Sequence, residues 1–265
     1  MSAMLEIKNL SKTFNKGTIN EKIALDHISL TLNEGDFVTV IGGNGAGKST
    51  MLNAVAGVWP VDEGAIIVDG NNITGLPDFK RATLIGRVFQ DPMLGSAPDM
   101  QIIENLALAA RRGKRRTLKW GVTKKEKEEY KEQLKILDLG LEDRLTQKVG
   151  LLSGGQRQAL TLLMASIQKP KLLLLDEHTA ALDPKTASKV LALTDKLVKE
   201  NNLTTFMVTH NMKDALKYGN RLIMMCDGKI IYDVSGEEKQ KLEVADLLHK
   251  FDTAGGVVSD SMMLG

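Results

Sequence analysis

The segment from Gly42 to Thr50 carries the residue types that bind a polyphosphate. It reads Gly42-Gly43-Asn44-Gly45-Ala46-Gly47-Lys48-Ser49-Thr50 and matches the phosphate-loop pattern, a glycine and four variable residues followed by Gly-Lys-Ser. Glycines tolerate positive φ and have no Cβ, so successive backbone N–H groups can point toward a bound phosphate. Lys48 adds a positive charge for the β- and γ-phosphates, and the Ser49 hydroxyl is a hard oxygen ligand suited to Mg²⁺. We predict from this segment that the chain binds a nucleoside triphosphate.

Two carboxylates, Asp176 and Glu177, follow an uninterrupted apolar run that begins at Lys171. Hydrophobicity without alternation is typical of a parallel strand buried on both faces, and open α/β sheets bind ligands at the carboxyl ends of such strands. We expect Asp176 to hold Mg²⁺ through its water shell and Glu177 to polarise the water that attacks the γ-phosphate. The alternative is an acidic pair that only ends a strand, and the phosphate loop upstream argues against it.

Two further side chains are candidates with a structural alternative. His210 follows a second apolar strand, Thr204 to Thr209, in the same sheet, and there we favour a contact with the γ-phosphate over a structural histidine. Phe14 lies upstream of the phosphate loop, where an aromatic ring is able to stack on adenine. A single phenylalanine near a strand end is equally often a packing residue, so the residues alone leave both readings open.

A second glycine-rich helix start occurs at Leu152-Ser153-Gly154-Gly155-Gln156. Such a start exposes several backbone N–H groups to an anion. The chain's own phosphate loop already encloses a triphosphate, so this segment makes best sense if it serves a nucleotide held by another subunit.

The elements that must position these residues form an α/β pattern. Period-2 alternation within residues 2–34 predicts antiparallel strands, joined by a strand from Gly64 to Gly70. We also predict strands for Asp36–Ile41 and Ala82–Phe89, and helices for Ser49–Ala56, Met100–Ala110, Lys124–Leu137 and Ser153–Gln168.

Composition excludes several classes of protein. The chain has 265 residues and a net charge of +2, which is too small to indicate a nucleic-acid partner. No apolar run approaches the ~20 residues that span a bilayer, and the N-terminus lacks a signal-peptide pattern, so we expect a cytoplasmic protein whose membrane work depends on other chains. The basic run from Arg111 to Arg116 is predicted to be solvated surface, with contact to anionic lipid headgroups as the alternative.

With these motifs in this order, the chain resembles the ATPase subunits of ABC transporters from about residue 3 to about residue 250. Gly42 to Thr50 matches the Walker A loop, and Leu172 to Asp176 matches the Walker B strand. Leu152 to Gln156 matches the signature motif, which in the family contacts the γ-phosphate across a head-to-tail dimer. Gln90 matches the Q-loop glutamine, which in the family touches Mg²⁺ and the lytic water.

The remaining matches assign single residues. Glu177 matches the catalytic glutamate, Ala181-Leu182-Asp183 the D-loop and His210 the switch histidine. Phe14 matches the adenine-stacking aromatic. His178 stands where proline is frequent in the family. We expect it either to change the backbone preference there or, as a titratable group beside Glu177, to alter the pKa of that carboxylate.

The resemblance implies a RecA-like P-loop NTPase core, an antiparallel β subdomain and an α-helical subdomain inserted at about residues 91–165. It implies one ABC ATPase domain over residues 1–250, and we expect residues 251–265 to form a mobile tail. The implied ligands are ATP and Mg²⁺.

The function implied is a transport motor in which two copies enclose two ATP molecules and drive separate membrane permease subunits. Such a protein lies at the inner face of the cell membrane. A free-standing ATPase chain favours import, and the segment from Asp176 to Thr186 is similar to an importer group associated with tryptophan and tyrosine, which works with a substrate-binding protein. The alternatives are an export system, a soluble ABC ATPase and a P-loop kinase, which would have no use for Leu152 to Gln156.

Overall fold

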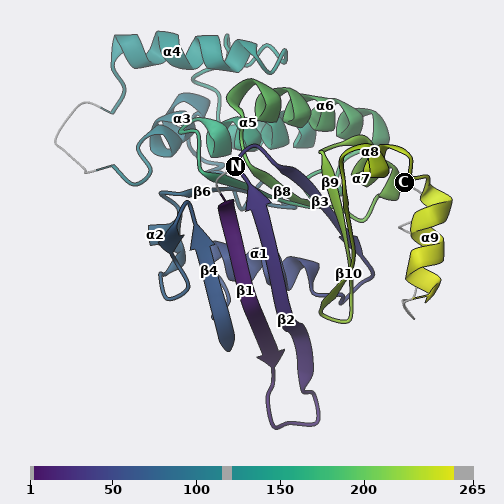
Figure 1. The fold of residues 1–265 in the computed structure, drawn as a ribbon. Coiled ribbons are helices and arrows are strands. Elements are labelled where there is room, and N and C mark those ends of the chain that lie inside the picture. Colours follow the sequence, from purple (N-terminus) through teal and green to yellow (C-terminus); the bar gives the residue numbers. More distant parts are fainter. Residues whose placement is uncertain (1–2, 115–120, 254–265) are drawn as a thin grey trace.

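Two β-sheets with one helix packed between them form the centre of the fold (Figure 1). The computed structural model describes residues 3–114 and 121–253. The antiparallel sheet has the strand order β2-β1-β4-β5, and the second sheet has the order β10-β9-β3-β8-β7-β6. The strands of the first sheet are β1 (Ala3–Phe14), β2 (Lys22–Asn33), β4 (Glu63–Val68) and β5 (Asn71–Asn72). The strands of the second are β3 (Phe37–Gly42), β6 (Ile85–Val88), β7 (Leu172–Asp176), β8 (Thr205–Val208), β9 (Arg221–Cys226) and β10 (Lys229–Ser235).

The second sheet is parallel from β6 to β9 and antiparallel only at β10. Its strands β3, β7 and β8 are buried along most of their length, as expected for strands covered on both faces. Because parallel strands end at the same edge, the residues that follow β3, β7 and β8 meet there. This edge therefore gathers the phosphate loop, the acidic pair and His210.

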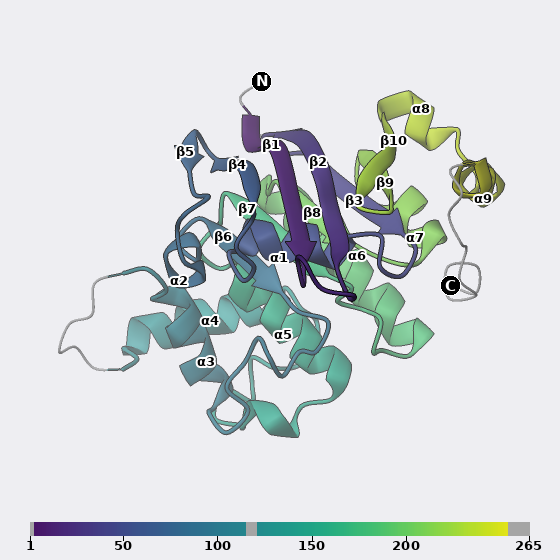
Figure 2. The ribbon, with the colours of Figure 1, turned by 90° about the horizontal axis from the view of Figure 1, so that it is seen from below.

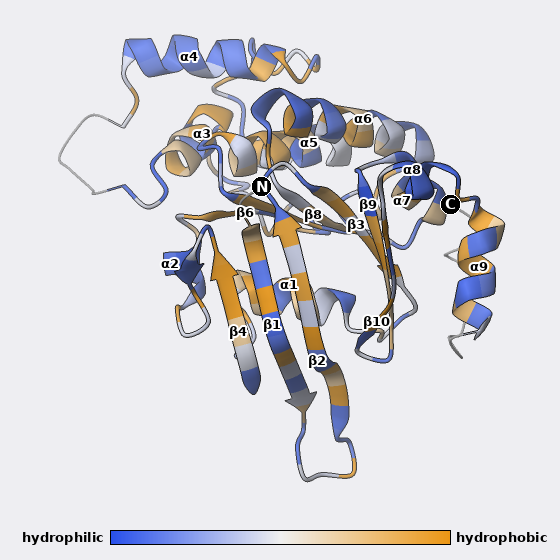
Figure 3. Cartoon of the chain, in the orientation of Figure 1, coloured by the Kyte–Doolittle hydropathy of each residue, from blue (hydrophilic) through white to orange (hydrophobic). Residues whose placement is uncertain are grey.

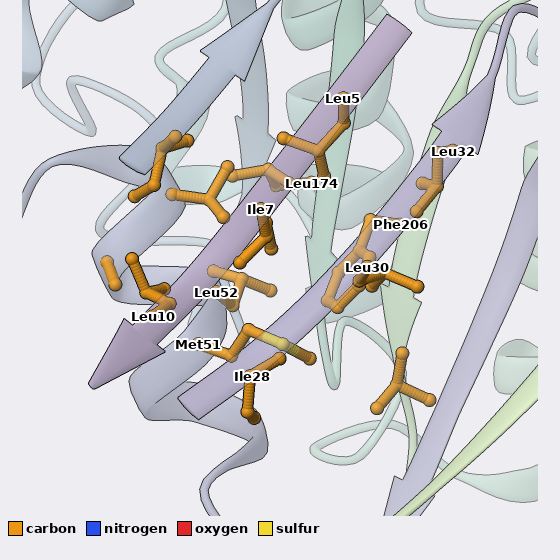
Figure 4. Packing of buried hydrophobic residues seen from close by; sticks show 14 of the residues in the cluster. Leu5, Ile7, Leu10, Ile28, Leu30, Leu32, Met51, Leu52, Leu174 and Phe206 are labelled. Atoms are coloured by element: carbon orange, nitrogen blue, oxygen red, sulfur yellow. The ribbon is translucent and has the colours of Figure 1, made fainter. Parts of the chain in front are cut away.

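Helix α1 (Lys48–Ala56) packs its apolar side chains against both sheets (Figure 4). Met51 and Leu52 belong to the same core as Leu5 and Ile7 of the antiparallel sheet and Leu174 of the parallel sheet. These side chains are fully or almost fully buried. The start of α1, and with it the phosphate loop, is thereby fixed relative to the carboxyl ends of the parallel strands.

The remaining helices cover the other side of the parallel sheet and its edges (Figures 1 and 2). Helices α5 and α6 pack on its far face, and α3 and α4 pack with one face of α5 in a separate core. Helix α4 buries only Tyr130 and Leu134, and Figure 3 shows the rest of it as hydrophilic. The helices are α2 (Asp78–Arg81), α3 (Ile102–Ala110), α4 (Lys124–Lys135), α5 (Gly154–Ser166), α6 (Pro184–Asn201), α7 (Met212–Lys217), α8 (Gly236–Gln240) and α9 (Val244–Thr253), with a 3-10 turn η1 at Val149–Leu151.

These elements confirm the α/β architecture with an antiparallel sheet and a helical part between β6 and β7. Two predicted boundaries are wrong. The strand expected over Ala82–Phe89 covers only Ile85–Val88, because buried Arg81 holds the preceding chain in turns by donating hydrogen bonds to the carbonyls of Ala54 and Val55 at 2.7 and 2.9 Å. Residues 251–253, which were expected to belong to the tail, lie in α9.

The reason for the later end of α9 is Phe251. Its side chain is buried against a small core formed by β9, β10 and α7, so it anchors the last turn of the helix. Residues 254–265 of the predicted tail lie outside the described residues. No helix in the described part of the chain is both long enough and apolar enough to cross a membrane.

Candidate functional site

The phosphate loop connects the end of β3 to the start of α1, as the sequence predicts. Gly47 has φ 99°, and a Cβ there would lie 2.4 Å from the carbonyl oxygen of Ala24, so only glycine fits. Lys48 is 6% exposed, and its ammonium donates hydrogen bonds to the carbonyls of Gly42 and Gly43 at 2.7 and 3.1 Å. Burial lowers the pKa of Lys48, whereas the charges of Glu177 and Asp176 raise it. The lysine therefore lies within the electrostatic reach of both carboxylates.

A hollow of ≈ 250 Å³ opens beside this loop. Among the residues predicted to bind the nucleotide, Phe14 and the loop from Gly45 to Thr50 line this hollow. Lys22 and Ala24, which were not predicted, line it as well. The Phe14 ring meets the edge of Trp59 with ring centroids 5.5 Å apart. The hollow thus combines an aromatic wall with a phosphate-binding loop, which fits the two ends of a nucleotide. Trp59 and Lys22 were not singled out from the sequence, because nothing local in the chain links them to the loop.

The acidic pair lies at the end of β7, and each of its members has its own basic neighbour. Glu177 has φ 43°, a left-handed conformation that directs the chain away from the sheet. Its carboxylate lies 3.4 Å from Nδ1 of His210, at the end of the adjacent strand β8. Asp176 lies 3.1 Å from Nη2 of Arg87 on the other neighbouring strand, β6. The fold thus brings Glu177, Asp176 and His210 to one edge of the sheet, and it places Arg87, which no sequence motif singled out, beside Asp176.

The two carboxylates have opposite pKa shifts. The hydrogen bond with His210 is the largest cause that lowers the pKa of Glu177, and the same contact raises the pKa of His210. Burial raises the pKa of Asp176, against the opposing effect of Arg87. Glu177 is consequently ionised at neutral pH and better suited to orient and polarise a water molecule by its charge than to accept a proton strongly.

The donor set around these residues fits a hard cation bound with few protein ligands. No group of three or more His, Cys, Asp or Glu side chains gathers into a metal cluster within residues 3–114 and 121–253. Mg²⁺ commonly uses one or two carboxylates, a hydroxyl, waters and the phosphates of its nucleotide. Asp176 at the strand end and the exposed Ser49 at the start of α1 are hard oxygen donors of this kind.

Gln90 follows β6 and is exposed. In the described part of the chain its side chain makes no hydrogen bond with the other candidate residues. The segment before it is fixed, because the buried Gln158 of α5 donates a hydrogen bond to the carbonyl of Phe89 at 3.2 Å. Gln90 is therefore held near the helix that starts at the second glycine-rich segment.

That second segment forms a capped helix start. The Ser153 hydroxyl accepts a hydrogen bond from the N–H of Gln156 at 3.3 Å, and the Gln156 side chain accepts one from the N–H of Ser153 at 3.1 Å. A Cβ on Gly155 would lie 2.2 Å from Cγ2 of Thr186, and a Cβ on Gly154 would lie 3.4 Å from Leu182. The predicted signature motif therefore lies next to the predicted D-loop and the start of α6, although these segments are far apart in the sequence.

The D-loop segment Ala181-Leu182-Asp183 leads directly into α6. Asp183 caps this helix, because its carboxylate accepts a hydrogen bond from the N–H of Thr186 at 3.1 Å, and Pro184 occupies the first turn. Among the described residues that line the hollow at the phosphate loop, none belongs to Leu152–Gln156 or to the D-loop segment Ala181–Asp183.

His178 is 2% exposed and turns away from Glu177 into the core. Its Nε2 lies 3.0 Å from the hydroxyl of Thr194 on α6. The hypothesis that His178 alters the pKa of Glu177 is wrong, because the basic groups that act on this carboxylate are His210 and Lys48.

A second, larger groove lies between the edge strand β6 and the helical part. It is lined by Arg87 and Phe89 on one side and by Leu108, Arg111 and Arg112 on the other. The prediction that the basic run is solvated surface is wrong for Arg112, which is half-buried and donates a hydrogen bond to the carbonyl of Ala165 at 3.4 Å. Arg111 pairs with Glu126 at 2.8 Å, and residues 115–116 of the run lie outside the described residues.

Comparisons with known proteins agree with this arrangement. A family model described as ABC transporter matches residues 25–180. The tyrosine transport ATP-binding protein of Clostridioides difficile (strain R20291) is 48% identical over 251 residues, which are 95% of this chain and 100% of that protein. The spermidine/putrescine import ATP-binding protein PotA of Haemophilus influenzae is 35% identical over 89% of this chain, which spans 59% of that protein's length.

The fold is also similar to that of solved structures. A solved dimer of an ATP-binding cassette in a post-hydrolysis state, bound to ADP and Pi, superposes with a TM-score of 0.75 and 32% identity over 88% of this chain and 98% of that one. The predicted RecA-like ABC ATPase fold is thereby confirmed. With its phosphate loop, acidic strand end and second glycine-rich helix start in this fold, the chain belongs to the ABC transporter family as an ATP-binding and ATP-hydrolysing subunit.

Proposed function

We propose that two copies of this chain close head to tail around two ATP molecules and thereby power the import of a small solute through separate membrane subunits. The observation that carries the proposal is the separation of the two phosphate-binding segments. The hollow at the phosphate loop has no lining residue from Leu152–Gln156 among the described residues, although Ser153 and Gly154 are exposed at the capped helix start. We infer that a second copy supplies the missing half of each site, and a related cassette is known as a dimer bound to ADP and Pi.

Within each site, the residues of one copy hold the nucleotide and those of the other close over it. Phe14 stacks on the adenine, the loop from Gly42 to Thr50 with Lys48 holds the phosphates, and Glu177 orients the attacking water. His210 contacts the γ-phosphate beside Glu177. Ser153 and the glycines after it come from the partner copy.

Mg²⁺ fits beside this loop, with Ser49, Gln90 and Asp176 as the residues that hold it or its waters. When bound, it neutralises charge on the phosphates. The lowered pKa of Glu177 favours the charged carboxylate at neutral pH, which suits a role in positioning and polarising water.

A mixing experiment tests the dimer. Lys48→Ala and Gly154→Asp proteins each fail alone, but in a mixed dimer one site carries both lesions and the other carries neither. We expect ATP-driven dimers, detected by size-exclusion chromatography, to reappear on mixing. The matched control mixes Lys48→Ala with Ser49→Ala, which leaves a damaged phosphate loop in both sites and should restore nothing. Equal results for the two mixtures would refute the head-to-tail arrangement.

The cargo proposed is an aromatic amino acid, because a relative that is matched along its whole length is a tyrosine transport ATP-binding protein. A substrate-binding protein delivers the amino acid to the permease. The proposed cargo is tested by measuring the uptake of labelled tyrosine in cells that lack this chain. Restoration of uptake by the wild type but not by Glu177→Gln is the expected result, and undiminished uptake in the deletion strain would exclude tyrosine.

The membrane subunits are proposed to dock in the large groove beside β6. Its volume of ≈ 1510 Å³ exceeds the ~300–1,000 Å³ typical of small-molecule pockets, so a segment of protein suits it better. Leu94 and Leu108 line it and are exposed, as expected of an apolar docking surface. Docking there places the chain at the cytoplasmic face of the membrane.

A further inference from the structure

Arg87 is a charged residue in the middle of a short strand whose other residues are buried. Its side chain is 14% exposed and that of Asp176 is 16% exposed. One nitrogen, Nη2, donates hydrogen bonds to the carboxylate of Asp176 at 3.1 Å and to the side-chain oxygen of Asn53 at 2.8 Å. The guanidinium therefore joins strand β7 to helix α1, the two elements that end or begin at the candidate site.

The other contacts of Arg87 hold the guanidinium in place from the groove side. Its Cζ lies 4.4 Å from the centre of the Phe89 ring, so the cation stacks on an aromatic face. Its Nε is buried without a hydrogen-bond partner among the described residues. The orientation of the side chain is thus fixed by Phe89, Asn53 and Asp176 together.

Stability alone does not account for this arrangement. The Arg87–Asp176 pair is largely removed from water, and an ion pair in such a place loses much of its Coulomb energy to desolvation. Replacing a buried pair by apolar residues is often neutral or stabilising. An unpartnered buried Nε adds a further cost. Removing Arg87 from water costs free energy, and the residue contacts a carboxylate that we propose to bind a metal. An effect on the orientation of that carboxylate explains its position better.

We propose that Arg87 is a positioning residue that holds the Asp176 carboxylate in the orientation required at the metal site. This inference rests on the proposed role of Asp176 toward Mg²⁺. A carboxylate that accepts a hydrogen bond on one oxygen keeps its second oxygen directed toward the metal's water shell. Partners of this kind behind a ligand typically change metal affinity about 10- to 100-fold when they are removed.

The test measures binding rather than turnover. A fluorescent, non-hydrolysable ATP analogue is titrated at increasing free Mg²⁺, starting from EDTA, with wild type and Arg87→Met. We expect equal affinity in EDTA, because Arg87 does not line the nucleotide hollow. The Mg²⁺ concentration that gives half of the metal-dependent gain in affinity should rise about tenfold or more in Arg87→Met.

Two variants keep the inference falsifiable if Arg87→Met folds poorly. Arg87→Lys retains the charge without the planar fork and should shift the midpoint less. Asn53→Ala removes the second anchor of Nη2 and should produce a smaller shift in the same direction. Arg221→Met is the matched control, because it deletes an Arg–Asp pair with Asp233 on strands β9 and β10 and should leave the Mg²⁺ midpoint unchanged.

The outcomes separate this inference from the proposed function. If the wild type binds the analogue equally with and without Mg²⁺, the metal role of Asp176 fails and the inference fails with it. If the wild type depends on Mg²⁺ but Arg87→Met, Arg87→Lys and Asn53→Ala all keep its midpoint, only the role of Arg87 is refuted. A lower midpoint in Arg87→Met would also refute it, because Arg87 would then compete with the metal.

Discussion

The buried histidine beside the acidic pair makes the stability of this protein depend on pH. The imidazole of His178 is 2% exposed and bonds through Nε2 to the hydroxyl of Thr194. That hydroxyl donates its proton to the carbonyl of Val190 at 2.8 Å, so in this pair Nε2 must be the donor. Burial lowers the pKa of His178 from 6.5 to about 4, because the charged form is not solvated there.

The folded and unfolded states bind a different number of protons at His178 below neutral pH. Below about pH 6.5 the unfolded chain takes up a proton on His178, whereas the folded chain does so only near pH 4. The unfolded state therefore binds more protons over this interval, and the free energy of unfolding falls as the pH is lowered. Integration gives a loss of about 2 kcal/mol at about pH 5 and about 3 kcal/mol when the pH reaches the folded pKa.

The assay is urea unfolding of the chain without nucleotide at neutral pH and at about pH 5, followed by circular dichroism. His178→Gln is the comparison, since its amide can still donate to Thr194 but does not titrate. Carboxylates and His210 contribute equally to both proteins, so the difference between them isolates His178. We expect the variant to lose about 2 kcal/mol less than the wild type. An equal loss in both proteins would refute the reasoning.

Three further predictions concern the site and its packing. Glu177→Gln should keep ATP binding but slow phosphate release by about 10²- to 10⁴-fold, and the pKa of His210, followed by NMR titration, should fall because its carboxylate partner is gone. Lys48→Ala should weaken binding of a fluorescent ATP analogue about tenfold or more, since a buried cation that faces the phosphates is lost; unchanged affinity would exclude this loop as the nucleotide site. Gly155→Ala should lower stability by about 1–3 kcal/mol, because its Cβ would lie 2.2 Å from Cγ2 of Thr186. Adding Thr186→Ser, which removes that methyl group, should recover most of the loss in a thermal melt.

Patterns that are local in the chain predicted the parts of the site that lie on one element. The phosphate loop needs only a strand, a run of glycines and a helix start, and all three are contiguous from Phe37 to Ala56. The acidic pair was recognisable because continuous apolar residues from Leu172 to Leu175 precede it, and such runs form strands whose ends meet at one edge.

Contacts between elements were not predictable in this way. Arg87 lies in a strand of only four residues, where alternation is too short to reveal a half-buried charge. Its partners Asn53 and Asp176 are distant in sequence, and only the pairing of β6 with β7 and the packing of α1 bring them together. The same holds for Arg81, which cannot be distinguished from a surface arginine until the end of α1 is placed beside it.

Two of the basic residues near the acidic pair, Arg87 and His178, show how burial assigns different roles to similar residue types. Arg87 cannot lose its proton within a protein, so it remains a charge beside Asp176 even though burial lowers its pKa. His178 can lose its proton, and burial keeps it neutral and directed toward α6. The positive charges that face Glu177 are therefore those of His210 and Lys48. Asp176 is paired with Arg87, so replacement of Arg87 should change the metal dependence of nucleotide binding. Glu177 is paired with His210, so replacement of His210 should change the pH dependence of hydrolysis.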